Sequence, residues 1–150
     1  MAAMEKITQT IMVYDDYKLL HQWEPWAALI DNRIMAIHEA SKMGIYTWVS
    51  VEPVFNANQA LHVMIELRDV VDHWKVGKLN HNKWYEDQVN WGYFLMDTEM
   101  ILRDRDVYIK EDLLMAARGG AWPKERVTHR ERWSIIGSKA GIVVSRKGGL

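Results

Sequence analysis

The segment 45–53, IYTWVSVEP, constrains the fold most strongly, because it has the length and composition of a buried β-strand. Side chains alternate between the two faces of a strand, so Ser50 and Glu52 share one face and the β-branched residues between them share the other. The apolar share is high on both faces, which favours a strand covered on both sides, as in a parallel sheet. Gly44, which can adopt a positive φ, and Pro53, which cannot donate a backbone hydrogen bond, mark its ends.

Strand-like and helical segments alternate along the first three quarters of the chain. The predicted strands are 6–13, 45–52, 70–79 and 106–110. Asp31 and Asn58 are predicted to cap two of the intervening helices, and a third helix is predicted over 86–103. Strands separated by helices describe right-handed βαβ units, so we expect an α/β fold with parallel strands in chain order. The glycine-rich loop of a Rossmann-type sheet is missing, and both an open sheet and a (β/α) barrel fit this order.

Composition predicts a soluble chain with two regions of opposite charge. The 150 residues are 49% hydrophobic, enough for one core, without an apolar run of about 18 residues that could span a membrane. The N-terminus lacks the apolar core of a signal peptide, so we expect a cytoplasmic protein. The net charge of −1 combines −7 in residues 1–114 with +6 in residues 115–150. Glycines at 119–120 mark the break, and we expect an acidic domain at 1–114 followed by a basic, glycine-containing extension at 115–150.

Polar residues follow the predicted strands at their carboxyl ends, where parallel α/β folds gather their functional groups. These candidate pocket residues are Ser50, Glu52, Lys78, Asn80 and Lys110. A polar group at the end of an apolar strand is costly to bury unless it is paired, so several of them at equivalent ends indicate one shared polar mouth. We expect Glu52 and Lys78 to converge there. The alternative is that the two form a plain ion pair or face solvent.

The basic extension has two interpretations. Its arginines and lysines are interleaved with tryptophans and could bind nucleic acid through phosphate contacts and stacking, with Arg126, Arg130 and Arg132 as candidates. The alternative, which we favour, is a solvated extension whose charge offsets the acidic domain. The six histidines of the chain lack the spacing of metal ligands, so no metal site is predicted.

Two distinctive segments, TWVSVEPV at 47–54 and WKVGKLN at 74–80, resemble the carboxyl-terminal half of a known family. This family is the spore-photoproduct-lyase-like group of radical S-adenosylmethionine (radical SAM) proteins. NWGYF at 90–94 and VYIKEDL at 107–113 add to the similarity, which covers about 5–114. The resemblance implies the later half of a partial (β/α) barrel of the TIM type.

The resemblance also implies a cofactor that this chain cannot hold alone. Members of the family bind a [4Fe–4S] cluster through a CxxxCxxC loop after their first strand, and the cluster cleaves S-adenosylmethionine. The chain has no cysteine, and we expect no room upstream of residue 5 for three further βα units. By position, four residues are similar to residues that line the family's barrel mouth near the cofactor ribose or the substrate: Ser50, Glu52, Lys78 and Asn80.

We therefore expect a radical SAM-like domain that lacks the cluster-binding half and is inactive alone, either as a subunit of a split enzyme or as a truncated remnant. S-adenosylmethionine and a [4Fe–4S] cluster would bind only if a partner chain supplies the cysteine motif. The alternative is a non-catalytic binding module, associated with nucleic acid through the basic extension. Half a barrel exposes apolar surface and a sheet edge, so we also expect self-association or binding of a chain that carries the other half.

Overall fold

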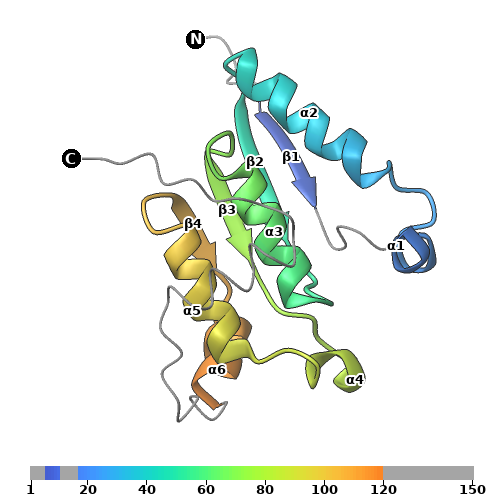
Figure 1. Cartoon of the computed structure of the whole chain (residues 1–150), viewed down its shortest axis with the longest axis vertical. Helices are drawn as coiled ribbons and strands as arrows, with labels where there is room; N and C mark the ends of the chain where they lie inside the picture. Colours follow the sequence, from blue (N-terminus) through green and yellow to red (C-terminus); the bar gives the residue numbers. More distant parts are fainter. Residues whose placement is uncertain (1–5, 11–16, 120–150) are drawn as a thin grey trace.

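The computed structural model describes residues 6–10 and 17–119, which form an α/β fold (Figure 1). Its elements are β1 (Lys6–Thr10), α1 (Tyr17–Trp23), α2 (Ile30–Lys42), β2 (Tyr46–Val51), α3 (Ala57–Leu67), β3 (His73–Val76), α4 (Lys83–Glu86), α5 (Trp91–Ile101), β4 (Asp106–Ile109) and α6 (Glu111–Gly119). The predicted α/β class is confirmed. In this part of the chain, no helix is long and apolar enough to cross a membrane.

The strands form one open, parallel sheet whose order, β1-β2-β3-β4, follows the chain. Trp48 of β2 lies opposite His73 of β3, and His73 lies opposite Asp106 of β4. The predicted parallel pairing of the strands around 45–52, 70–79 and 106–110 is confirmed. This open sheet does not establish that the chain forms a barrel, whole or partial.

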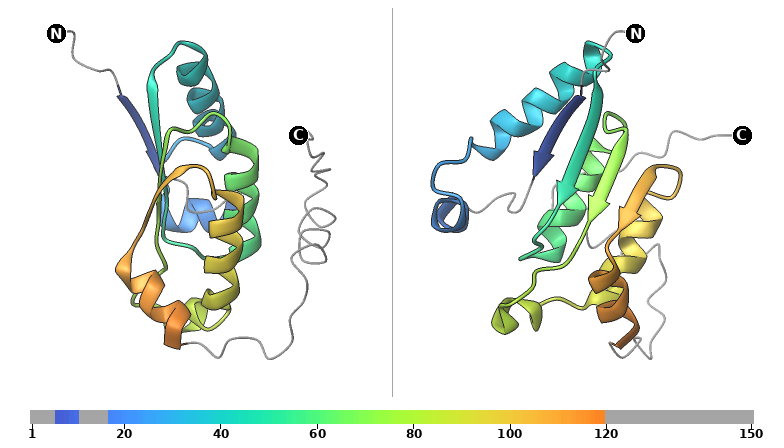
Figure 2. Two further views of the ribbon diagram at one scale, coloured as in Figure 1. Left: turned by 90° about the vertical axis from the view of Figure 1, so that its left-hand side faces the viewer. Right: turned by 180° about the vertical axis from the view of Figure 1, so that it is seen from behind.

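The helices α2, α3 and α5 lie on one side of the sheet, as the left-hand panel of Figure 2 shows. In the right-hand panel, which is seen from behind, the strands lie in front of these helices. We call the face away from α2, α3 and α5 the open face. The prediction of a strand covered on both faces is therefore only partly met by β2 in the described part of the chain, where these three helices cover one face and Tyr46 and Trp48 on the other are half-buried. The apolar share of the open face comes largely from Tyr46 and Trp48, which are half-buried aromatic residues.

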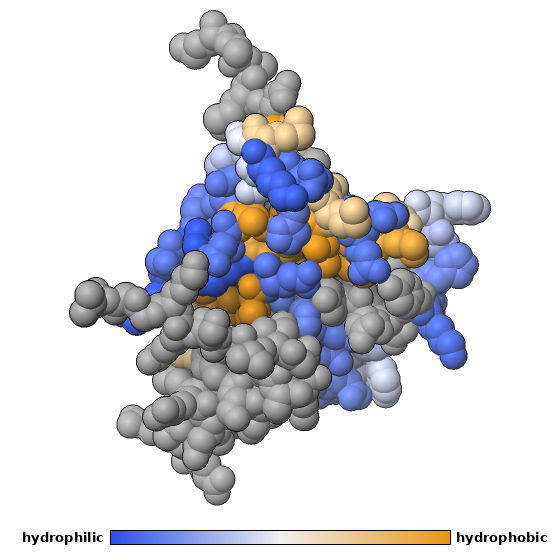
Figure 3. All heavy atoms as spheres, turned by 45° about the horizontal axis from the view of Figure 1, so that its top comes forward, coloured by the Kyte–Doolittle hydropathy of each residue, from blue (hydrophilic) through white to orange (hydrophobic). Residues whose placement is uncertain are grey.

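The core lies between the sheet and the three helices. Its fully buried side chains come from both layers and include Ile37, Val49, Leu61, Met64, Trp74 and Phe94. Each such apolar side chain contributes roughly 1.5–3 kcal/mol relative to its exposure to water. On the face of the molecule shown in Figure 3, apolar side chains reach the surface in a strip bordered by hydrophilic ones.

Two helices begin at residues other than those predicted. Asn56, and not Asn58, caps α3, because its side-chain oxygen accepts a hydrogen bond from the Gln59 N–H at 3.2 Å. Leu29 precedes α2 without a side-chain cap, and Asp31 lies inside the first turn. A carboxylate in that turn still interacts favourably with the helix dipole.

The helix predicted over 86–103 is α5, which is shorter at both ends. A short helix, α4, ends at Glu86, and α5 starts only at Trp91, after Asn90 accepts a hydrogen bond from the Tyr93 N–H at 3.1 Å. α6 ends at Gly119, where glycines mark the predicted break, and it runs across the expected boundary at 114–115. The predictions for 11–13 and for 120–150 lie outside the described residues.

Thr47 connects β2 to the loop before β3 near the amino end of the sheet. Its hydroxyl donates to the Val70 carbonyl at 2.7 Å, and its N–H donates to Asp72 Oδ2 at 2.8 Å. The Asp72 N–H donates back to the Thr47 carbonyl at 3.1 Å. Thr47 is fully buried, so these bonds satisfy polar groups that water cannot reach. Gly44 provides the turn into β2 with a φ of 73°, which confirms its predicted positive φ.

Replacement of Thr47 by Val should lower the free energy of unfolding by about 1–2 kcal/mol, because it leaves the Val70 carbonyl without its donor. Urea unfolding followed by circular dichroism measures the change. Thr98→Val is the matched control, because Thr98 is also fully buried but its hydroxyl has no hydrogen-bond partner among the described residues. It should be neutral or stabilising. Equal losses in the two variants would contradict the assigned role of Thr47.

Candidate functional site

Glu52 is the centre of an ionic cluster on the open face. Its Oε1 lies 2.6 Å from Lys75 Nζ, and its Oε2 lies 3.0 Å from Lys110 Nζ. The Ser50 hydroxyl donates to Glu52 Oε1 at 3.0 Å. We call Ser50, Glu52, Lys75 and Lys110 the Glu52 cluster. Its members come from β2, from β3 and from the residues that directly follow β2 and β4, so parts of the chain distant in sequence meet at one point.

The register of the sheet brings these residues together. Ser50 lies opposite Lys75 in the pairing of β2 with β3. The Lys110 N–H donates to the Val76 carbonyl at 2.9 Å, which fixes Lys110 beside the end of β3. Because side chains alternate along a strand, the burial of Trp74 and Val76 under the helices places Lys75 on the open face.

Gly77 makes room for the pair between Glu52 and Lys110. A Cβ atom at this position would lie 2.6 Å from Glu52 Oε2 and 2.7 Å from Lys110 Cδ. Any larger residue would therefore displace the ends of these two side chains. The glycine in the WKVGKLN segment serves the ionic cluster by its lack of a side chain.

The cluster is ionised at neutral pH. Partial burial raises the pKa of Glu52, but hydrogen bonds from Lys75, Lys110 and Ser50 outweigh it and hold the pKa below the ordinary value for a glutamate. The hydrogen bond to Glu52 raises the pKa of Lys110. Two ammonium groups then face one carboxylate, which leaves an excess of one positive charge. The side chains of Glu52 and Lys110 are 19% and 34% exposed, so water screens their attraction in part.

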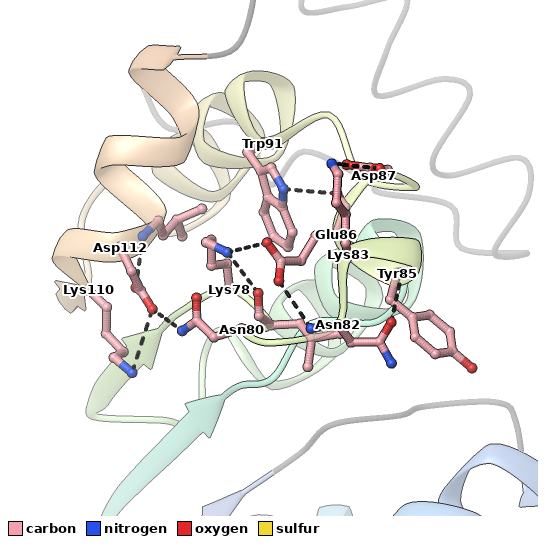
Figure 4. Close-up of polar contacts among 12 residues, drawn as sticks. Lys78, Asn80, Asn82, Lys83, Tyr85, Glu86, Asp87, Trp91, Lys110 and Asp112 are labelled. Atoms are coloured by element: carbon pink, nitrogen blue, oxygen red, sulfur yellow. Dashed lines mark hydrogen bonds and ion pairs between the residues drawn. The ribbon is translucent and has the colours of Figure 1, made fainter.

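Asp112 connects Asn80 to the Glu52 cluster (Figure 4). Its Oδ2 accepts a hydrogen bond from Asn80 Nδ2 at 2.5 Å and lies 4.0 Å from Lys110 Nζ. The structure thus brings together Ser50, Glu52 and Lys110 directly, as predicted, and adds Asn80 through Asp112.

Lys78 belongs to a different group of contacts. Its Nζ lies 2.9 Å from Glu86 Oε2, donates to the Leu79 carbonyl at 2.9 Å and stands 5.7 Å from the centre of the Trp91 ring (Figure 4). A plain ion pair between Lys78 and Glu52 is wrong, because Lys78 pairs with Glu86 whereas Glu52 pairs with Lys75 and Lys110. β3 ends at Val76, so Lys78 lies beyond its regular alternation. The convergence of Lys78 and Glu52 on one pocket stays a prediction.

Lys75 is the member of the cluster that sequence reasoning missed. The signal was present, because alternation from the apolar Trp74 and Val76 already places Lys75 on the opposite face. What was lacking was the register that puts it beside Ser50.

A second pair lies further toward the amino ends of the strands on the open face. His73 Nδ1 lies 2.8 Å from Asp106 Oδ2, and the rings of Trp48 and His73 meet edge to face with centroids 5.4 Å apart. The carboxylate fixes the orientation of the imidazole. Throughout 6–10 and 17–119, no three His, Asp or Glu residues are placed to hold a metal ion. The nucleic-acid candidates Arg126, Arg130 and Arg132 lie outside the described residues and stay predictions.

No family model matches this chain, and no curated protein or solved structure matches it. The radical SAM resemblance therefore stays a prediction from the quoted sequence segments. The geometry of the Glu52 cluster stands independently of it.

Replacement of Glu52 by Gln should flatten the loss of stability in acid. Since the pKa of Glu52 is lowered in the folded state, its ionised form stabilises the fold above the unfolded-state value of about 4.5, and this contribution is lost as the pH falls through the folded-state pKa. Urea unfolding between about pH 6 and pH 3 should show a steeper decline for the wild type than for Glu52→Gln.

Glu39→Gln is the control for this measurement. The pKa of Glu39 is lowered by its hydrogen bond from Lys42, but these side chains are 63% and 69% exposed and water screens the pair. The free energy of unfolding should decline with falling pH as steeply for Glu39→Gln as for the wild type. An equally steep decline for the wild type and Glu52→Gln would show that the Glu52 cluster does not lower the pKa of this carboxyl group.

Proposed function

We propose that this chain is the later half of a radical SAM-type (β/α) barrel, which has no cluster chemistry by itself and offers a polar ligand-binding surface at the carboxyl ends of its strands. The observation that carries the proposal is the convergence of Lys75 and Lys110 on Glu52 from neighbouring parallel strands. The carboxyl ends of the strands are where (β/α) barrels bind their ligands. The placement of α2, α3 and α5 on one face also supports the proposal, because such barrels keep their helices outside.

The [4Fe–4S] cluster of the family does not fit the residues of this chain. Such clusters are held by cysteine thiolates, and none of the 150 residues is a cysteine. No reaction step is therefore assigned to a cluster bound by this chain. In the split-enzyme interpretation, a partner chain would bring both the cysteine motif and the cluster.

The chemical groups of S-adenosylmethionine fit the Glu52 cluster better. Each lysine ammonium has three N–H donors, so Lys75 and Lys110 have donors beyond those directed at Glu52, and a ligand carboxylate can accept them. The Glu52 carboxylate and the Ser50 hydroxyl can accept hydrogen bonds from ribose hydroxyls or from an amine. Gly77 has no side chain, which lets Glu52 and Lys110 approach each other closely in this arrangement.

Two alternatives differ in what the chain does in the cell. A truncated remnant would keep these contacts without any partner that supplies chemistry. A non-catalytic module that binds nucleic acid is favoured by one observation, the charge of +6 in residues 115–150. Of that segment, the structure describes only the end of α6.

Isothermal titration calorimetry of the full chain with S-adenosylmethionine tests the ligand surface. Lys110→Met should weaken binding by about tenfold or more, because it removes a charge-assisted hydrogen bond. Gly77→Ala should weaken it as well, because the added Cβ displaces the ends of Glu52 and Lys110. Gly119→Ala is the control, since a Cβ there meets nothing within 4 Å. The absence of binding by the wild type, or one affinity for all variants, would overturn the proposal.

Anaerobic reconstitution with iron and sulfide tests the cofactor expectation. The purified chain should develop no iron–sulfur absorbance, because it supplies no thiolate. The same treatment of a mixture with a chain that carries CxxxCxxC is the positive control. Stoichiometric iron retained by the isolated chain, or cleavage of S-adenosylmethionine without a partner, would contradict the expectation.

A further inference from the structure

We propose that a second copy of this chain completes the barrel, in a two-fold symmetric dimer in which β4 of each copy lies beside β1 of the other. This inference rests on the half-barrel function proposed above and names the partner that covers the open face. Three features of the structure support it: the two sheet edges, the placement of the helices and the charge balance of the open face.

Among the described residues, no strand lies beside the outer edge of β1 or of β4, so both edges of the sheet can pair with another strand. β1 and β4 each have a neighbouring strand on one side only, and they are similar in length, at 5 and 4 residues. An edge strand presents unpaired N–H and C=O groups that can accept another strand. The Lys110 N–H points into the sheet toward Val76. Because successive amides of a strand point in opposite directions, the N–H groups of Val107 and Ile109 point to the free edge.

A two-fold axis parallel to the strands lets both edge strands of each copy pair at the same time. It sets β4 of one copy parallel to β1 of the other, and the same contact recurs on the opposite side. Two sheets of four strands then give eight, the number in a closed (β/α) barrel, with the helices of both copies outside. The assembly is finite, because a closed symmetric contact leaves no edge for a third copy.

The charges of the open face permit contact with an identical face. On β2, β3, β4 and the residues that follow them, its carboxylates are Glu52, Asp106 and Asp112 and its ammonium groups are Lys75 and Lys110, so charges of both signs are present and nearly balance. Each of these groups already has a partner in its own chain, so covering the face buries no unpaired charge. A polyanion would gain little from such a face, which favours a second copy over nucleic acid as its occupant.

Sedimentation velocity of the full-length chain at concentrations up to about 0.1 mM tests the dimer. The wild type should sediment as a dimer. Val107→Pro should dissociate it at least tenfold more readily, because proline removes the outward N–H of β4. Val107→Ala is the matched control, since it also shortens the side chain but keeps the N–H, and it should remain a dimer.

Circular dichroism first establishes that each variant is folded. If Val107→Pro fails to fold, Tyr108→Glu replaces it, because Tyr108 is 54% exposed and lies on the open face, where a symmetric dimer brings two copies of the new charge together. Met35→Glu, at a 63% exposed position on α2, is then the control. Tyr108→Glu should dissociate the dimer and Met35→Glu should leave it intact.

Three results would overturn the dimer: a wild-type monomer throughout the concentration range, an open-ended series of larger species, or a dimer that persists in the folded edge or open-face variant. The titration with S-adenosylmethionine separates this failure from that of the proposed function. A monomer that binds the ligand would disprove the dimer alone, whereas a dimer that binds no ligand would disprove the ligand surface alone.

Discussion

The alternation of side chains along β2 and β3 decides on which face of the sheet Glu52 and Lys75 of the candidate site lie. The helices α2, α3 and α5 bury one face of the sheet. Val49, Trp74 and Val76 pack against these helices, so the residues that alternate with them along each strand must point to the open face. A shift of one residue in either strand would turn a lysine or a glutamate into that apolar layer, at a cost of several kcal/mol. The packing of the core therefore sets the register, and the register sets the Glu52 cluster.

The Glu52 cluster contributes little to the stability of the fold, and its main effect is to place charged groups together on the open face. Its charged side chains are between about one fifth and one third exposed, a range in which ion pairs contribute little net free energy because water competes for both partners. Two ammonium groups around one carboxylate nevertheless hold that carboxylate ionised and leave a positive charge in excess. Gly77 shows how closely the backbone fits this arrangement, since even a methyl group there would meet both Glu52 and Lys110. A cluster of this kind is suited to binding a polar ligand.

The sequence predicted well what depends on local periodicity. The α/β class and the shared face of Ser50 and Glu52 follow from patterns a few residues long, and both hold in the structure. Helix ends were less predictable, because two asparagines compete for the start of α3 and only one, Asn56, has the extended backbone of a cap. In the predicted helix 86–103, Asn90 is the cap at which α5 begins, and the apolar spacing that extends before it led to a start that is too early.

Contacts that depend on pairing between distant strands could not be predicted from the sequence. His73 meets Asp106 across 33 residues, and nothing in either segment alone indicates that register. The same holds for Lys75, whose face follows from alternation but whose position beside Ser50 depends on the register between β2 and β3. Lys78 was chosen in its place because it stands near the expected end of a strand that in fact stops at Val76. Alternation identifies a face, whereas a site also requires the register between strands.

The central claim is that Glu52 is held as a carboxylate between two ammonium groups on the face of the sheet away from the helices. The most direct measurement is a pH titration of the Glu52 side-chain carboxyl carbon by NMR in the wild type and in Lys75→Met. The pKa of Glu52 should lie below the ordinary glutamate value of 4.5 in the wild type and should rise when Lys75 is replaced. A wild-type pKa at or above 4.5, or one that does not change in Lys75→Met, would contradict the claim.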